Sequence, residues 1–424
     1  MNISLRFYRA EKEKSMEVPL PPRLLDGATA TNLYQAGMPK DACPELWILE
    51  HPDVLQNLQK EYIVNSAQVL YAPTFTANRA MLARFGLQDK VEEINAKLVA
   101  LTKGAAQGTG VLVAGDIAPT NLSVEPFGET PFLELVNIYS EQAFALKHAG
   151  VDLIVCETMI SMTGMRAAVL GARQTGLPVY VTMTMDSEGD TLDGSNLLAC
   201  MVTAQSLGVQ AFGVNCTDDY DQMAQQLEKL SHYATVPLIV KPNLGTPDAD
   251  GNYATTPVEM AEKMKTLLDA GASIIGGCCG TTPAHIGALH RMMEEYDFSG
   301  RELPKPDPED IIACNYDEVF FLSEDLEFSE PLSCEVDMTE EILEAEDQGW
   351  DAVLVEVPTA DDAYHFAQNA HMTDLPVAFL SDSEGALEMA LIYYPGRALV
   401  CSSQSDLEHE VLQKIADGYG ALLF

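Results

Sequence analysis

The chain has 424 residues, of which 47% are hydrophobic and 21% charged, and its formal net charge is −40. No apolar run reaches the roughly 18 residues that a membrane-spanning helix needs, and the acidic excess disfavours nucleic acids and anionic membranes as partners. The length favours one large domain followed by a smaller one. The charged N-terminus lacks the apolar core of a secretory signal, so we expect a cytoplasmic protein.

Charge is distributed unevenly along the chain. Residues 301–424 contain 29 acidic and 4 basic side chains, whereas residues 1–300 contain 35 acidic and 20 basic ones. This change predicts a domain boundary near residue 300. The acidic region is either a solvated surface or a docking face for a basic partner.

Short apolar runs recur along the first 300 residues after a charged leader over residues 1–20. The first run, residues 23–27, precedes a helical stretch over residues 28–37. The other predicted strands are 68–72, 111–115, 151–156, 177–183, 209–214, 236–240 and 272–275. Helical segments separate them at 53–66, 91–107, 132–149, 162–175, 197–207, 219–233 and 257–270. Such nearly all-apolar runs are typical of parallel strands covered on both faces.

Eight βα units in this length predict an α/β protein with a (β/α)8 TIM barrel over residues 1–300 and a second, smaller α/β domain over residues 301–424. A doubly wound sheet could carry the same alternation, but eight units favour closure. In a barrel, functional side chains lie at the C-terminal strand ends. Those ends carry Asp26, Pro73, Thr74, Asp116, Glu157, Thr158, Thr184, Asn215, Cys216, Pro242, Asn243, Cys278 and Cys279.

The nine cysteines are scattered and odd in number, which does not indicate a disulfide framework. Cys278 and Cys279 follow the last predicted strand; adjacent thiols are poor disulfide partners for each other but good ligands for a soft divalent metal. Cys216 ends the sixth strand, near the eighth in a closed barrel. We therefore expect these three thiols to converge.

Two segments make the chain recognisable. Gly213-Val214-Asn215-Cys216 and the run from Gly276 to Pro283 (GGCCGTTP) resemble the zinc signature of the homocysteine S-methyltransferase family. Further ordered matches cover residues 25–28, 74–78, 115–120, 157–158 and 241–245. The resemblance spans about residues 20–295. It is greatest to the branch formed by the N-terminal homocysteine-binding modules of cobalamin-dependent methionine synthases.

The C-terminal region carries a shorter resemblance. Residues 378–383, 394–398 and 418–421 are similar to part of a pterin-binding barrel of methionine synthases. The region is too short for eight βα units, so we expect a reduced or half barrel. No segment resembles a cobalamin-binding module, and we expect any methylcobalamin to be carried by a separate protein.

Three cysteine thiolates around Zn²⁺ leave one open position, where a substrate thiol can bind and lose its proton. A thiolate, not a thiol, attacks a methyl group. We predict Cys216, Cys278 and Cys279 as metal ligands and catalytic centre. The alternative is a closed structural zinc site, and Asn243 is a candidate for the fourth position when substrate is absent.

The resemblance implies that Asp26 and Glu157 hold the amino group of homocysteine. Two carboxylates suit an ammonium group, and the backbone amides at Gly27 and Ala28 suit a carboxylate. The alternatives are a helix N-cap for Asp26 and a buried ion pair for Glu157.

Other rim residues have less specific roles. We expect Asn215 to orient the site, and Thr74 and Asn78 either to line the pocket or to cap local structure. Three departures from the family pattern leave the identity of the thiol open. Thr29-Ala30-Thr31 replaces Met-Gly-Thr, Pro73 replaces Asn, and Asn121 replaces Gly.

These observations favour a zinc-dependent methyltransferase of methionine biosynthesis that takes methyl from a methylcorrinoid protein, which the acidic region would help to dock. A second hypothesis keeps the thiol chemistry but uses S-methylmethionine or another small donor. A third, from a different class, is a non-catalytic zinc-stabilised subunit or scaffold.

Overall fold

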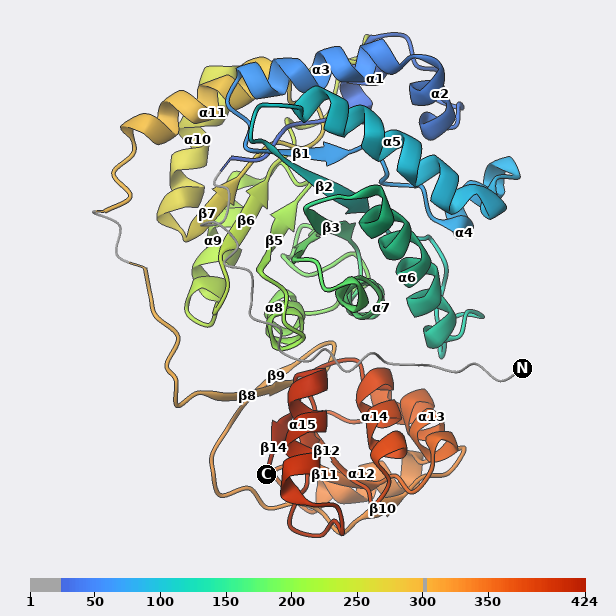
Figure 1. Ribbon diagram of the computed structural model, residues 1–424. Helices are drawn as coiled ribbons and strands as arrows, with labels where there is room; N and C mark the ends of the chain where they lie inside the picture. The colour runs from blue at the N-terminus through green and yellow to red at the C-terminus, as the bar shows by residue number, and fades with distance from the viewer. Residues whose placement is uncertain (1–23, 300–302) are drawn as a thin grey trace.

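A computed structural model describes residues 24–299 and 303–424 (Figure 1). The charged leader, and the boundary predicted near residue 300, lie outside the described residues. Within them, no helix combines the length and apolarity needed to cross a membrane.

The larger sheet contains parallel strands that pair in chain order. They are β1 (Val69–Ala72), β2 (Leu112–Ile117), β3 (Leu153–Met159), β4 (Val179–Met183), β5 (Ala211–Asn215), β6 (Leu238–Lys241) and β7 (Ala272–Ile275). Leu24 pairs with Ile275 of β7, and Leu25 pairs with Val69 of β1. This extended segment closes the sheet as the first of eight strand positions, so the predicted (β/α)8 barrel is confirmed.

Helices surround this barrel (Figure 1). They are α1 (Ala30–Gln35), α2 (Pro44–Glu50), α3 (Pro52–Val64), α4 (Arg79–Leu82), α5 (Val91–Ala106), α6 (Phe132–Ala149), α7 (Met162–Ala172), α8 (Leu197–Ser206), α9 (Tyr220–Ser231), α10 (Pro257–Asp269) and α11 (Pro283–Glu295). The sequence predicted α6 with its observed bounds, whereas it missed the short α2 and α4. The start of α10 is explained by a capping box, in which Thr256 and Glu259 each bond the other's backbone amide.

The barrel interior is packed with side chains. Leu25, Val69, Tyr71, Ala114, Leu153, Val155, Tyr180, Ala211, Ile239 and Ile274 form one buried cluster inside the closed sheet. A larger cluster lies between the strands and the helices. Because apolar side chains occupy both faces of each strand, polar groups are displaced to the strand ends.

The second sheet is smaller, parallel and open. Its strands are β10 (Leu332–Ser333), β11 (Val353–Glu356), β12 (Val377–Leu380), β13 (Leu399–Val400) and β14 (Leu422–Leu423). Its helices are α12 (Thr339–Asp347), α13 (Ala360–Asn369), α14 (Glu384–Tyr393) and α15 (His409–Tyr419). This arrangement confirms the smaller α/β region. Its kinship with a pterin-binding barrel stays a prediction.

An antiparallel hairpin lies between the two sheets in the chain and in space. It is formed by β8 (Ile311–Cys314) and β9 (Val319–Leu322). Cys314 of β8 contacts Thr203 of α8, with Sγ and Oγ1 3.2 Å apart. Figure 1 shows α7 and α8 on the side of the barrel that faces the second region. The two sheets are thus joined through helices of the barrel wall.

Candidate functional site

The three predicted thiols meet at the C-terminal rim of the barrel. The Sγ atoms of Cys216, Cys278 and Cys279 all lie within 4.8 Å of one another, and those of Cys216 and Cys279 are 3.8 Å apart. Two sulfurs bound to one tetrahedral zinc at about 2.3 Å would be about 3.8 Å apart. The donor set therefore fits zinc. Among the residues described, it is the one group of three Cys, His, Asp or Glu side chains placed to hold a single ion.

Glycines in the two motifs explain how the thiols converge. A Cβ at Gly213 would lie 1.9 Å from the carbonyl oxygen of Ile239, so β5 and β6 need glycine there to approach. A Cβ at Gly277 would lie 2.5 Å from Oγ1 of Thr281. Cys216 itself has a φ of 60°, a left-handed conformation that is costly for a non-glycine residue. This backbone conformation directs the Cys216 thiol away from the line of β5 and toward the thiols of Cys278 and Cys279.

Close packing of the thiols makes their protonation unequal. Hydrogen bonds from Cys216 and Cys278 lower the pKa of Cys279 to about 3. Hydrogen bonding to Cys278 and Cys279 raises the pKa of Cys216. The three thiols thus compete for protons within one hydrogen-bonded group. A bound divalent ion would replace those protons.

Asn215 joins the thiols to the end of β3. Its Nδ2 donates to Oγ1 of Thr158 at 2.7 Å and lies 3.7 Å from Sγ of Cys278. Its Oδ1 accepts from the Thr158 amide at 3.2 Å. Thr158 has a φ of 57°, which is strained for a β-branched residue. Asn215 therefore lies where it can orient a ligand, the role expected for it.

Asp26 and Glu157 lie beside the thiols but differ in their partners. Oδ2 of Asp26 accepts from the Tyr71 amide at 2.8 Å, while its Oδ1 is buried without a partner. Glu157 forms a buried ion pair with Lys241, with Oε1 2.5 Å from Nζ. The ion-pair alternative for Glu157 is thus observed, whereas Thr29, not Asp26, is the N-cap of α1.

Asp116 and Lys241 complete this charged cluster. Oδ1 of Asp116 is buried without a partner, and Nζ of Lys241 lies 3.7 Å from the Tyr71 ring centroid. Burial raises the pKa of Asp26 to about 7 and that of Asp116 well above its usual range. Burial opposes the charge on Lys241, but Glu157 and the other anionic groups raise its pKa. Lys241 is thus the positive charge that offsets the three carboxyl groups of Asp26, Asp116 and Glu157.

Sequence reasoning did not assign Asp116 and Lys241 to the site. Asp116 is predicted only as a strand-end residue within the family match over residues 115–120, and Lys241 only as part of the match over residues 241–245. A signal existed for the lysine, since it ends the otherwise apolar strand β6. A charged residue in a doubly covered strand needs a buried partner.

The amides proposed to bind a carboxylate are partly engaged. The Ala28 amide donates to Oγ1 of Thr281 at 2.9 Å, and the same hydroxyl donates to the Cys278 carbonyl at 2.7 Å. A Cβ at Gly27 would also lie 2.7 Å from that hydroxyl. Gly27 and Ala28 therefore pack against the metal loop and hold it in place.

The remaining predicted residues serve mainly as local supports. Thr74 donates to the Asp116 carbonyl at 2.8 Å, and Asn78 caps α4. Asn243 donates to the Cys216 carbonyl at 3.0 Å and accepts from Gly245 at 2.8 Å. To coordinate a metal while it accepts from Gly245, the Asn243 oxygen would use its second lone pair.

One departure from the family pattern has a backbone explanation. Asn121 has a φ of 59°, in the left-handed region where glycine is favoured. Asparagine tolerates that conformation better than most residues. The loop after β2 can thus keep its turn without glycine.

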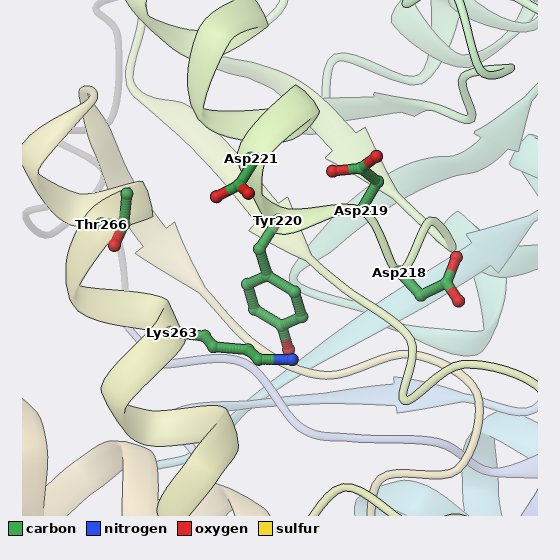
Figure 2. A pocket seen from close by; sticks show the side chains of 6 residues that line it. All are labelled: Asp218, Asp219, Tyr220, Asp221, Lys263 and Thr266. Atoms are coloured by element: carbon green, nitrogen blue, oxygen red, sulfur yellow. The ribbon is translucent and has the colours of Figure 1, made fainter.

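A hollow of about 440 Å³ lies at the start of α9, and Figure 2 shows the side chains that line it. Its lining residues are Asp218, Asp219, Tyr220, Asp221, Lys263 and Thr266. Nζ of Lys263 lies 5.2 Å from the Tyr220 ring centroid. No cysteine is among these described lining residues, so the hollow is separate from the thiol group.

A closed (β/α)8 barrel with three thiols at its C-terminal rim defines a barrel protein with a candidate soft-metal centre. The family profile described as homocysteine S-methyltransferase matches residues 23–293. The chain therefore belongs to the homocysteine S-methyltransferase family, as its motifs predicted.

Individual relatives agree with this assignment. Methionine synthase of Mycobacterium tuberculosis is 31% identical over 282 residues, which covers 62% of this chain but 24% of that protein. Methionine synthase of Mycobacterium leprae is also 31% identical, with 23% of its length covered. The chain thus spans about a quarter of the length of these curated relatives.

Solved structures match the barrel over nearly their whole length. The metallated form of the homocysteine methyltransferase MmuM from Escherichia coli is 26% identical, with a TM-score of 0.55 over 64% of this chain and 96% of that chain. The oxidized form of the same protein gives a TM-score of 0.53. These matches leave the smaller sheet without a counterpart in MmuM.

Proposed function

We propose that this protein is a zinc-dependent S-methyltransferase that activates homocysteine as a thiolate and methylates it to methionine. The observation that carries this proposal is the convergence of Cys216, Cys278 and Cys279 beside a buried cluster of carboxylates with unpartnered oxygens. Three thiolates suit a zinc ion that keeps one position open.

Zinc held by these thiolates would supply a binding position for the substrate sulfur and would favour its thiolate form at neutral pH. The chain's own residues would place the rest of the amino acid. Asp26 and Asp116 each keep a buried oxygen free, and an ammonium group would satisfy both. Glu157 would not pair with the ammonium group directly, because Lys241 already balances its charge. It would contribute through its ion pair with Lys241.

The negative charge of the cluster supports an amino-acid substrate. Asp26, Asp116 and Glu157 face a single lysine, so an added cation offsets repulsion among the carboxylates. Gly27 and Ala28 would form the floor of the pocket and hold the metal loop through Thr281. Asn215 would keep the Cys278 thiolate oriented through its bond with Thr158.

For the methyl donor, we propose a methylcorrinoid protein acting in trans. Similarity to two methionine synthases supports this donor, and the acidic region offers a surface for the encounter. The alternative is a small donor such as S-methylmethionine, which would bind the barrel directly. We also propose that the protein acts in the cytoplasm.

The decisive assay uses zinc-replete full-length protein with homocysteine. Methylcobalamin, a methylated corrinoid protein and S-methylmethionine are offered separately, and methionine is measured. Methionine from either corrinoid source supports the main proposal, and methionine from S-methylmethionine alone supports the alternative. No product from any donor would contradict both and favour the scaffold hypothesis.

A further inference from the structure

A cavity of about 480 Å³ lies between the barrel and the second region, and none of the three thiols lines it. From the barrel it is lined by the loop over residues 122–127, the start of α7 and residues 193–195. From the second region, Tyr316, α13 and the end of α14 contribute. Its size is that of a pocket for a small molecule.

Arg166 of α7 gives this cavity a fixed positive charge. Its side chain is 2% exposed, and its two terminal nitrogens donate to the carbonyls of Leu391 at 2.9 Å and Ile392 at 3.1 Å. Its Nε has no partner. Among the ion pairs formed by the described residues, none includes Arg166.

Buried charges in proteins are normally paired, because an unpaired one loses its hydration without compensation. The Leu391 and Ile392 carbonyls belong to the last turn of α14, whose dipole offsets part of the charge on Arg166, but no carboxylate pairs with it. The two carboxylates that line the cavity accept hydrogen bonds from other residues of its wall and do not pair with Arg166. Glu125 accepts from the Tyr364 hydroxyl at 3.2 Å, and Asp193 accepts from the Ser195 hydroxyl at 2.9 Å.

Aromatic rings from both sides form the rest of the wall. The Phe132 ring lies 5.7 Å from the Arg166 guanidinium carbon and 6.4 Å from the Tyr393 ring, which lies 5.9 Å from the Tyr364 ring. At another side, Phe127 contacts His371 edge-on at 5.2 Å. Such walls favour a flat ring with offset or edge-on contacts.

We propose that this interdomain cavity binds a small aromatic carboxylate, with Arg166 as its anion anchor and the rings of both regions as its walls. The ligand would accept a charge-assisted hydrogen bond from Nε of Arg166. Because both regions form the walls, the ligand would also hold the second region against the barrel. This site is independent of the zinc centre and of the methyl donor.

The test is calorimetric titration of the full-length protein with 2-naphthoate, 2-naphthamide and 2-naphthylmethylamine. The three share one ring system and differ in charge. We expect 2-naphthoate to bind at least about tenfold more tightly than the amide, as a charge-assisted hydrogen bond implies, and the amine to bind most weakly. Equal binding of all three, preference for the amine, or no binding of 2-naphthoate would overturn the proposal.

Substitutions distinguish the loss of the anion anchor at Arg166 from a loss of folding. Arg166→Met should weaken 2-naphthoate binding at least about tenfold. Arg173→Met is the matched control, because Arg173 also reaches the second region, donating to the Gly418 carbonyl at 2.8 Å, but does not line the cavity. If Arg166→Met does not fold, Ala367→Trp places bulk in the cavity from α13 and should abolish binding. Unchanged binding in Ala367→Trp, or equal losses in the two arginine variants, would contradict the assignment.

Discussion

The two parallel sheets of this protein cover their apolar faces in different ways. The larger sheet closes on itself through Leu24 and Leu25, and its inner face is filled by its own side chains. The smaller sheet stays open, and its second face is covered by other segments. Phe320, Leu322, Leu326 and Phe328, which precede the sheet in the chain, pack against that face.

The polar groups at the strand ends of the two sheets therefore differ in how they are hydrogen-bonded. Closure brings strand ends together around one point, where Asp26 after the Leu24–Leu25 segment, Tyr71 of β1 and Asp116 of β2 keep buried polar atoms without partners. In the open sheet the polar strand ends bond locally. The Ser381 hydroxyl donates to the Val357 carbonyl at 2.6 Å, and the Ser405 hydroxyl donates to the Ser381 carbonyl at 2.7 Å. Closure therefore gathers unused bonding capacity at the barrel rim, whereas Ser381 and Ser405 of the open sheet use their hydroxyls locally.

The largest effect should come from removing a thiol at the closed rim. Cys278→Ala should reduce bound zinc from about one ion per chain to near zero, because two thiolates hold zinc poorly. Methyl transfer should fall at least about a hundredfold. Metal analysis and initial rates test this.

Cys334→Ala is the matched control, because that thiol lies after β10 of the open sheet and contacts the Glu356 carbonyl. It should keep full zinc content and full activity. An active Cys278→Ala protein would remove the metal from the mechanism.

Most of the fold was predictable from sequence because each strand of the barrel is short, apolar and flanked by turn residues. The convergence of Cys216 with Cys278 and Cys279 followed from counting strands. By contrast, the ion pair between Glu157 and Lys241 depends on side-chain direction across 84 residues of sequence, which no local pattern encodes. For the same reason, the cavity around Arg166 could not be predicted.

A second effect concerns the buried charges. Lys241→Met leaves Glu157 buried without its partner and should reduce the free energy of unfolding by about 3–5 kcal/mol. Denaturant unfolding measures the loss. The double variant Lys241→Met/Glu157→Gln should recover much of that stability, because the unpaired charge is gone. Additive losses in the double variant would show that the pair is not coupled.

A third, smaller effect should appear in substrate affinity. Asp116→Asn removes one proposed partner of the ammonium group and should raise KM for homocysteine about tenfold, which corresponds to about 1.4 kcal/mol. Because the metal centre is untouched, zinc content and kcat should change little. Steady-state kinetics with varied homocysteine test this. An unchanged KM would remove Asp116 from the substrate pocket.

The smallest effect on activity should come from the open sheet. Arg397 donates to the carbonyls of Ile312 at 3.0 Å and Gly420 at 2.9 Å, joining the hairpin to that sheet. Arg397→Met should lower local stability by about 1–3 kcal/mol, seen as faster amide exchange in β8 and β13. Zinc content and KM should stay the same. A loss of zinc would show that the barrel rim depends on the second region.

The central claim is that three thiolates hold zinc with a position open for a substrate thiol. Calorimetric titration of the zinc-loaded protein with homocysteine, repeated in buffers of different ionisation enthalpy, tests it most directly. Thiol coordination should release about one proton per homocysteine bound near neutral pH, because a free thiol has a pKa of about 8.5. Homoserine, which lacks the thiol, should release about one proton fewer than homocysteine. Homocysteine binding without proton release, or no binding to the zinc-loaded protein, would contradict the account.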